Sequence, residues 1–362
     1  MAEYKLSQQF MKNVFSGPLR IALNTIVVFF SYRYFLQAFG AEKYSIWLLL
    51  AVIVDFGRLG NLGINDIVIK YVAEAKQNND KARVSACFST SMAIITVSFT
   101  AICIPLFMAK GLVASYLQIN PLHNELFLFM YSKIILLSFL TIIMEFMTGS
   151  LYGINRADIA NYLQSAGSIL GTLLSILLVS LKFDFFGLYL GNLAGIVIVI
   201  IVSFISIYRV LGYMPLDIFS INRRIATEIM RSGLIMFSAS VINLLFLPMG
   251  KILLSRYIGS VEVVCYDFAF KLSFQIRSLF DLGLKALISE ISSIQNDVHQ
   301  LIGLIKKVYK YLLIVSLPLY SFIFAGSELI LELWLASAYI PLLNFTFRII
   351  LIAFFINLLA VP

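Results

Sequence analysis

The sequence has few charged residues, few cysteines and few histidines, and each shortage excludes a class of protein. Of its 362 residues, 13% are charged and 60% are hydrophobic, whereas soluble domains are roughly 25% charged and roughly 45–50% apolar. A soluble globular chain is therefore excluded. The three cysteines, Cys87, Cys103 and Cys265, lie in apolar stretches without metal-binding spacing, so neither a disulfide framework nor a zinc site is expected. His123 and His299 stand alone in predicted loops.

The sequence also lacks catalytic motifs and large polar loops. It contains no phosphate-binding glycine loop, nucleophile elbow, metal-ligand cluster or dinucleotide fingerprint, so we expect no enzyme activity, cofactor or metal. The longest predicted loop, about 209–231, is basic and poor in carboxylates. A membrane glycosyltransferase or polymerase would need a larger loop with carboxylates. The net charge of +8 is dispersed along the chain, which argues against a nucleic-acid partner.

Long apolar runs are abundant. A helix needs about 20 apolar residues to cross a bilayer, and the runs here have that length. We therefore predict an all-α, polytopic helical membrane protein with about ten transmembrane helices. The predicted spans are 14–37, 44–66, 84–108, 124–147, 159–181, 186–208, 232–255, 263–288, 308–327 and 342–362.

The eighth predicted span carries an unusual stripe of charge. Its charged residues are Asp267, Lys271, Arg277, Asp281 and Lys285, which fall within about 120° of one helix face. Intramembrane charges normally face a bundle interior or a watery cavity, so the stripe predicts a cavity lining. The alternative interpretation is structural, because neighbouring charges of opposite sign are mostly four residues apart and can neutralise one another as ion pairs.

Basic residues are distributed unevenly among the predicted loops. With a cytoplasmic N-terminus, the inner segments hold fourteen basic residues and the outer loops hold four, as the positive-inside rule requires. The outer four are Lys43, Lys110, Lys182 and Arg256. The spans themselves hold nine cations and five acids, so the predicted membrane interior is rich in charge and biased to positive.

Glycines mark two further regions. Gly57, Gly60 and Gly63 surround the inner end of the second span. They predict a broken helix that either lines a cavity or packs closely on its neighbours. Spans five and six carry Gly-x-x-x-Gly patterns at 167–171 and 191–195, which predict helix contacts through small residues.

Several short motifs together resemble one family. They are Phe39-Gly40 with Tyr44-Ser45-Ile46-Trp47, Leu62-Gly63-Ile64 with Tyr71-Val72-Ala73-Glu74, Leu151-Tyr152-Gly153-Ile154-Asn155-Arg156 with Asn161-Tyr162, and Ile258-Gly259 with Tyr266-Asp267-Phe268-Ala269. In these the chain resembles the Wzx-type polysaccharide (O-antigen repeat unit) flippases of the MATE-like multidrug/oligosaccharidyl-lipid/polysaccharide (MOP) superfamily.

The resemblance implies a fold and an activity. We expect two six-helix bundles around a central cavity: 1–208 as the first bundle, 209–231 as a cytoplasmic loop, and 232–362 as four helices of an incomplete second bundle. Because family members have twelve or more spans, we expect a truncated chain. The implied activity is alternating-access flipping of an undecaprenyl-pyrophosphate-linked oligosaccharide across the bacterial inner membrane, for lipopolysaccharide biosynthesis. The implied partners are this substrate, membrane lipid, a glycan polymerase and glycosyltransferases.

Site residues follow from the span charges and the resemblance together. Cations that could line the cavity and bind the pyrophosphate are Arg33, Arg58, Lys271, Arg277 and Lys285. Acids that could serve ion coupling or ion pairing are Asp55, Glu145, Asp267 and Asp281. A multidrug exporter of the same fold is the alternative, but it would need an acidic cavity for its cationic substrates.

The orientation can be tested by labelling single cysteines. We expect Ser220→Cys, in the predicted cytoplasmic loop, to resist an impermeant thiol reagent added to intact cells, and Ser260→Cys to react with it. The reason is the excess of basic residues on the inner side. Labelling of Ser220→Cys from outside would reverse the orientation.

Overall fold

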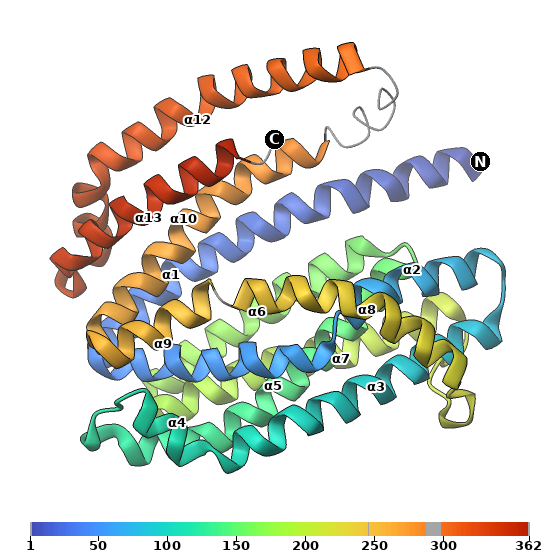
Figure 1. Ribbon diagram of the computed structural model, residues 1–362, viewed down its shortest axis with the longest axis horizontal. Coiled ribbons are helices and arrows are strands. Elements are labelled where there is room, and N and C mark those ends of the chain that lie inside the picture. Colours follow the sequence, from blue (N-terminus) through green and yellow to red (C-terminus); the bar gives the residue numbers. More distant parts are fainter. Residues whose placement is uncertain (1, 245, 287–297, 361–362) are drawn as a thin grey trace. The chain divides into compact units, whose positions relative to one another are not determined.

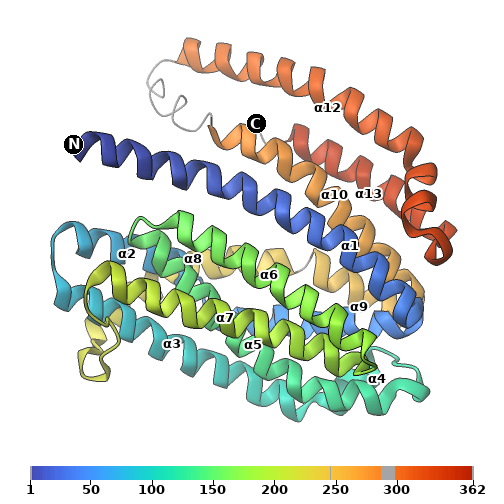
Figure 2. The same ribbon diagram turned by 180° about the vertical axis from the view of Figure 1, so that it is seen from behind.

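The computed structural model describes residues 2–244, 246–286 and 298–360, and Figures 1 and 2 show that these form helices joined by short connections. No strand occurs within those ranges, and the predicted all-α class is confirmed. The helices are α1 (Ala2–Arg58), α2 (Ile64–Gln77), α3 (Lys81–Met108), α4 (Lys110–Tyr116), α5 (Asn124–Gly153), α6 (Ala157–Ser180), α7 (Asp184–Leu211), α8 (Arg223–Leu244), α9 (Leu247–Tyr257), α10 (Ser260–Ala286), α12 (Val298–Leu335) and α13 (Pro341–Leu359). Short 3-10 turns are η1 (Leu59–Asn61), η2 (Pro121–His123), η3 (Ile218–Ser220) and η4 (Ala336–Ala338).

Seven segments of the described chain are long and apolar enough to cross a membrane. They are Lys81–Met108, Pro121–Gly153, Ala157–Ser180, Asp184–Leu211, Arg223–Tyr257, Gln300–Ala338 and Pro341–Leu359. These seven coincide with predicted spans, which confirms a multi-pass membrane protein. The spans predicted at 14–37, 44–66 and 263–288 stay predictions. The last of them falls on α10, whose charged residues reduce its apolar character.

The connection between the first two predicted spans is a helical bend rather than a loop. Helical structure continues on both sides of Gly40 in α1, and only this residue departs from helical geometry, with φ 71° and ψ 165°. Glycine adopts this conformation readily because it lacks a Cβ atom. The chain reverses there, since the rings of Tyr32 and Tyr44 have their centroids 5.7 Å apart. A straight helix would separate these two residues by about 18 Å.

Contacts between residues divide the chain into two compact units. Unit 1 comprises Met1–Ser31 and Ile46–Tyr257, and unit 2 comprises Tyr32–Ser45 and Ile258–Pro362. This division differs from the predicted one at the 209–231 loop. Within unit 1, α9 is held because the Ser255 hydroxyl donates a hydrogen bond to the Leu117 carbonyl oxygen at 2.7 Å. Within unit 2, the bend of α1 is held by Tyr32, whose ring lies 4.9 Å from that of Phe268.

The core of unit 1 lies among α2, α3 and α5. Phe88 of α3 and Phe146 of α5 are buried and pack edge to face, with ring centroids 4.7 Å apart. Ile64 and Val68 of α2 are buried in the same cluster. This core supports the break between α1 and α2, because α2 begins inside it.

The glycines at that break allow close packing. A Cβ atom on Gly60 would lie 2.8 Å from the Cα atom of Phe99 in α3. Gly63 has φ 71°, and a Cβ atom there would lie 2.9 Å from the Gly233 carbonyl oxygen in α8. Of the two interpretations of these glycines, close helix packing is therefore confirmed.

Glycines also join α6 to α7, which lie side by side (Figure 2). A Cβ atom on Gly191 would lie 2.6 Å from the Gly171 carbonyl oxygen and 2.5 Å from the Ser175 nitrogen. One on Gly195 would lie 2.5 Å from the Gly167 carbonyl oxygen. The predicted contact through both Gly-x-x-x-Gly patterns is confirmed.

Substitution of Gly191 tests this interface. Because the added methyl group would meet backbone atoms, we expect Gly191→Ala to destabilise the protein by about 1–3 kcal/mol, the usual range for overpacking. The measurement is the thermal melting temperature of the purified protein in detergent. Gly303→Ala in α12 is the control, since its Cβ atom would meet nothing within 4 Å. A Gly191→Ala protein that melts at or above the wild-type temperature would contradict the packing.

Candidate functional site

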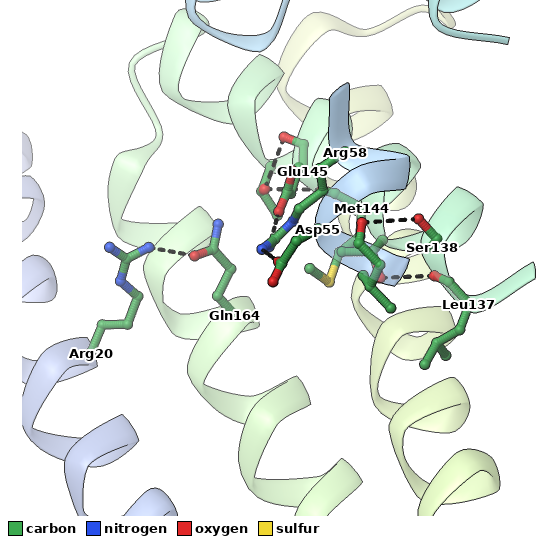
Figure 3. Close-up of polar contacts among 11 residues, drawn as sticks. Arg20, Asp55, Arg58, Leu137, Ser138, Met144, Glu145 and Gln164 are labelled. Carbon is green, nitrogen blue, oxygen red and sulfur yellow. Dashed lines mark hydrogen bonds and ion pairs between the residues drawn. The ribbon is translucent and has the colours of Figure 1, made fainter. Parts of the chain in front are cut away.

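A polar site in unit 1 lies where α1 ends (Figure 3). The helix ends at Arg58, and the 3-10 turn η1 follows it. Leu62 after this turn has a left-handed conformation, with φ 49°. Irregular backbone is tolerated at membrane depth where protein buries it or where it lines a cavity. The last turn of α1 thereby brings Asp55 and Arg58 beside Glu145 of α5.

Arg58 links the two carboxylates. Its Nη1 lies 3.4 Å from Asp55 Oδ1, and its Nη2 donates a hydrogen bond to Glu145 Oε1. The Arg58 side chain is 46% exposed, and each acid is 27% exposed. A guanidinium has five N–H donors, so Arg58 keeps donors for a further partner. Asp55, Arg58 and Glu145, which we call the Arg58 cluster, carry one net negative charge.

A second contact in Figure 3 was not singled out from the sequence. The Nη1 of Arg20 in α1 donates a hydrogen bond to the Oε1 of Gln164 in α6, and both side chains are partly buried. Arg20 could have been found by its charge within a predicted span. Gln164 is uncharged, and a lone amide in an apolar run gives no comparable signal.

The turn between α5 and α6 holds the start of α1 within unit 1. Asn13 Nδ2 donates a hydrogen bond to Asn155 Oδ1 at 3.0 Å, and the Asp158 backbone nitrogen donates to Asn13 Oδ1 at 3.1 Å. Asn161 Nδ2 donates to Ser16 Oγ at 2.8 Å. This turn carries part of the family resemblance, and these contacts account for its polar residues structurally.

Lys76 at the end of α2 strengthens the same turn. Its Nζ donates a hydrogen bond to the Ile154 carbonyl oxygen at 2.6 Å. Burial lowers the pKa of the Lys76 ammonium group, and the nearby Arg156 guanidinium lowers it further. Lys76 therefore serves the fold at this end of unit 1.

In unit 2, the first pair of the α10 stripe is present. Lys271 Nζ lies 2.9 Å from Asp267 Oδ2 and donates a hydrogen bond to the Tyr32 hydroxyl at 3.1 Å. The ammonium also lies 5.1 Å from the centre of the Tyr32 ring, within cation–π range. Asp267 is 0% exposed and Lys271 is 37% exposed. The predicted ion pair is confirmed, and it ties α10 to the bend of α1.

The remaining predicted cations have different surroundings. Arg277 Nε lies 3.5 Å from Asp281 Oδ1, as the spacing predicts. Lys285 belongs to α10, but its side chain lies outside the described residues. Arg33 is partly buried in unit 2 and makes no ion pair with a described side chain.

Most of the described cations predicted to line the cavity lie beside acidic side chains. Arg58, Lys271 and Arg277 all lie against carboxylates, whereas Arg33 does not. The acids that pair with them are Asp55, Glu145, Asp267 and Asp281. Substrate binding and ion coupling by these residues stay predictions. Within residues 2–244, 246–286 and 298–360, no group of three or more His, Cys, Asp or Glu side chains could hold a metal ion.

Comparison with known families identifies the chain's relatives. A family model described as "Polysaccharide biosynthesis protein" matches residues 10–280, three quarters of the sequence. The chain belongs to this family. The matched range contains the Arg58 cluster and α10 up to Phe280. A comparison with curated proteins gives no significant match.

Solved structures similar to this chain include transporters. An inward-facing multidrug resistance MATE family transporter of the MOP superfamily has a TM-score of 0.72 at 16% identity, covering 94% of this chain and 82% of that one. A MATE protein in complex with MaD5 has a TM-score of 0.63 at 17% identity, covering 96% and 80%. A MOP superfamily transporter from Pyrococcus furiosus has 0.63 at 14% identity, covering 97% and 79%.

At these identities the likeness establishes the fold alone. The chain is thus a multi-pass membrane protein of the polysaccharide biosynthesis family, with the fold of MATE and MOP superfamily transporters. The Wzx-like resemblance read from the sequence is thereby confirmed at the level of the family.

The buried ion pair of unit 2 gives an asymmetric prediction. Lys271→Ala leaves the fully buried Asp267 carboxylate without this cation, so we expect a loss of roughly 3 kcal/mol or more, typical of a broken buried pair. Asp267→Ala should cost less, because Lys271 is partly exposed and can be solvated. Removing both side chains should recover most of the loss. Melting temperature and membrane abundance are the measurements.

The exposed pair Arg224–Glu228 of α8 provides the control. Its side chains are 89% and 39% exposed, so Arg224→Ala should change stability by less than about 1 kcal/mol. Equal stability of Lys271→Ala and the wild type would show that the buried pair is dispensable.

Proposed function

We propose that the protein carries an oligosaccharide linked to a polyprenyl diphosphate, of the undecaprenyl type, from the cytoplasmic to the periplasmic leaflet. The family match supports a saccharide cargo, and the transporter fold supports carriage by alternating access. The proposed setting is a bacterial inner membrane, with the N-terminus in the cytoplasm. A glycan polymerase and glycosyltransferases are proposed partners, because such enzymes make and consume this cargo.

The observation that carries the proposal is the mixture of donors and acceptors inside unit 1. Arg20 and Arg58 donate hydrogen bonds, Asp55 and Glu145 accept them, and Gln164 can do both. Sugar hydroxyls both donate and accept, so a mixed surface matches them better than a surface of one charge. Partly exposed ionic groups at membrane depth are costly and mark substrate pathways more often than packing.

The diphosphate needs cations, and the proposed ligands are Arg33, Arg58, Lys271, Arg277 and Lys285. Arg33 is the strongest candidate, because no described acid neutralises it. Its planar guanidinium can bind phosphate oxygens in bidentate fashion, which an ammonium cannot. Asp55, Glu145, Asp267 and Asp281 are secondary candidates for ion coupling, since protonation of any of them would weaken an ion pair.

Multidrug export is the alternative, and one observation favours it. The Arg58 cluster has a net negative charge, which would attract a cationic drug. Arg20 in the same unit and Arg33 in unit 2 argue against it, because each adds a positive charge that no described carboxylate offsets. The two functions differ in their cargo and can be separated in cells.

Arg58 is the residue whose substitution tests the proposal. In cells that lack their own flippase, we expect Arg58→Ala to reduce surface glycan about tenfold or more, since a hydrogen bond to a charged group is worth about 1.5–3 kcal/mol. Arg58→Lys keeps the charge but cannot bridge both acids, so it should be intermediate. Surface glycan is measured alongside membrane protein level.

Two controls separate binding from stability. Arg83→Ala removes an exposed cation that pairs with Glu74 at 3.7 Å, and glycan display should be normal. If Arg58 is only structural, Asp55→Ala and Glu145→Ala added to Arg58→Ala should restore both abundance and glycan. Normal glycan with Arg58→Ala at normal abundance would refute the role of Arg58. Lost drug resistance with intact glycan would favour the exporter.

A further inference from the structure

Unit 1 contains a cavity of about 560 Å³ that includes no residue of the Arg58 cluster. Helices α1, α3, α4, α5 and α9 line it, mainly with aliphatic side chains such as Leu49, Val52 and Ile252. Its volume lies within the range of about 300–1,000 Å³ that is usual for small-molecule sites. Arg256 is the single charged residue of the lining.

Arg256 is held in place by α4. Its Nη1 donates a hydrogen bond to the Tyr116 carbonyl oxygen at 3.1 Å, and its guanidinium lies 4.1 Å from the centre of the Tyr116 ring. The neighbouring Ser255 fastens the same end of α9 to the Leu117 carbonyl oxygen. No described carboxylate forms an ion pair with Arg256. The cavity thus joins an apolar interior to one fixed positive charge.

We propose that this cavity binds an anionic membrane phospholipid, with one acyl chain among the aliphatic side chains and the phosphate on Arg256. An apolar cavity with a cation at its wall complements an amphiphile that has a hydrocarbon chain and an anionic head. Charge-assisted hydrogen bonds from arginine to phosphate are short and strong. Basic residues beside a membrane attract anionic lipids for the same reason.

The lining fits a phospholipid better than the proposed cargo. A diphosphate bearing sugars would need several further donors, whereas the lining adds few polar side chains. Tyr131 is one of them, and its hydroxyl already donates to the Leu106 carbonyl oxygen at 2.8 Å. Sugar hydroxyls placed against this lining would lose hydrogen bonds to water without replacing them. The site is therefore separate from the proposed transport path.

Native mass spectrometry of the purified full chain tests the proposal. The added probes are phosphatidylglycerol and phosphatidylcholine with identical acyl chains. We expect one phosphatidylglycerol per protein, bound more tightly than phosphatidylcholine. Arg256→Ala should weaken phosphatidylglycerol binding about tenfold, and Arg256→Lys should retain most of it. Lys110→Ala, which removes an exposed cation of α4 outside the lining, should have no effect.

A cavity-filling variant tests the acyl-chain site separately. Val113 lines the cavity, so Val113→Trp should weaken binding of both lipids while Arg256 remains. The matched control is Val97→Trp, at a 70% exposed position of α3 outside the lining. Melting curves show whether each variant is folded. If Val113→Trp is not folded, Val113→Phe takes its place.

Three results would overturn the proposal. Unchanged phosphatidylglycerol binding in both Arg256→Ala and Val113→Trp would place the lipid elsewhere. Equal binding of the two lipids, insensitive to Arg256, would remove the role of the positive charge. Displacement of phosphatidylglycerol by a lower concentration of polyprenyl diphosphate would assign the cavity to the cargo lipid.

Discussion

A charge at membrane depth needs a partner, and this constraint governs how the long helices carry their polar residues. An unpaired charge in hydrocarbon is costly, and several of the described cations avoid it in different ways. Arg58 binds carboxylates. Lys133 lies 4.7 Å from the centre of the Phe129 ring, and Arg348 donates a hydrogen bond to the Ser327 hydroxyl at 2.8 Å. Each of these cations has a partner within the described residues, so helices of high apolar content can carry ionic groups.

The same constraint acts on the backbone where α1 ends. A broken helix exposes N–H and C=O groups that hydrocarbon cannot satisfy. Here the Leu62 N–H donates to the Leu59 carbonyl oxygen at 3.0 Å, and the Ser98 hydroxyl donates to the Gly60 carbonyl oxygen. The absence of side chains at Gly60 and Gly63 lets α3 and α8 approach closely enough to cover the break. The position of Arg58, the last residue of α1, therefore depends on this helix break, whose backbone groups are hydrogen-bonded.

The sequence predicts features that depend on local spacing and misses those that depend on distant contacts. Asp267 and Lys271 are four residues apart, so their pairing follows from helix geometry alone. Arg58 and Glu145 are 87 positions apart, and no periodicity connects them. Arg20 and its uncharged partner in α6 are 144 positions apart. The bend at Gly40 is also not predicted from the sequence. The hydrophobic pattern predicts a loop between the first two spans, whereas a single residue with positive φ makes the connection.

A count of charges does not show which cations are available to an anion. Nine span cations against five acids indicate an anion site, but Arg58, Lys271 and Arg277 each lie beside a carboxylate, and the Arg58 cluster is negative. Among the proposed ligands whose side chains the structure describes, a diphosphate would reach Arg33 without displacing a carboxylate, whereas at Arg58 it would displace one. Displacement would release Asp55 or Glu145 from its ion pair with Arg58. Cargo binding and the breaking of an ion pair would then be linked through one guanidinium. The ion-pair and ion-coupling interpretations of these acids would describe two stages of the same cycle.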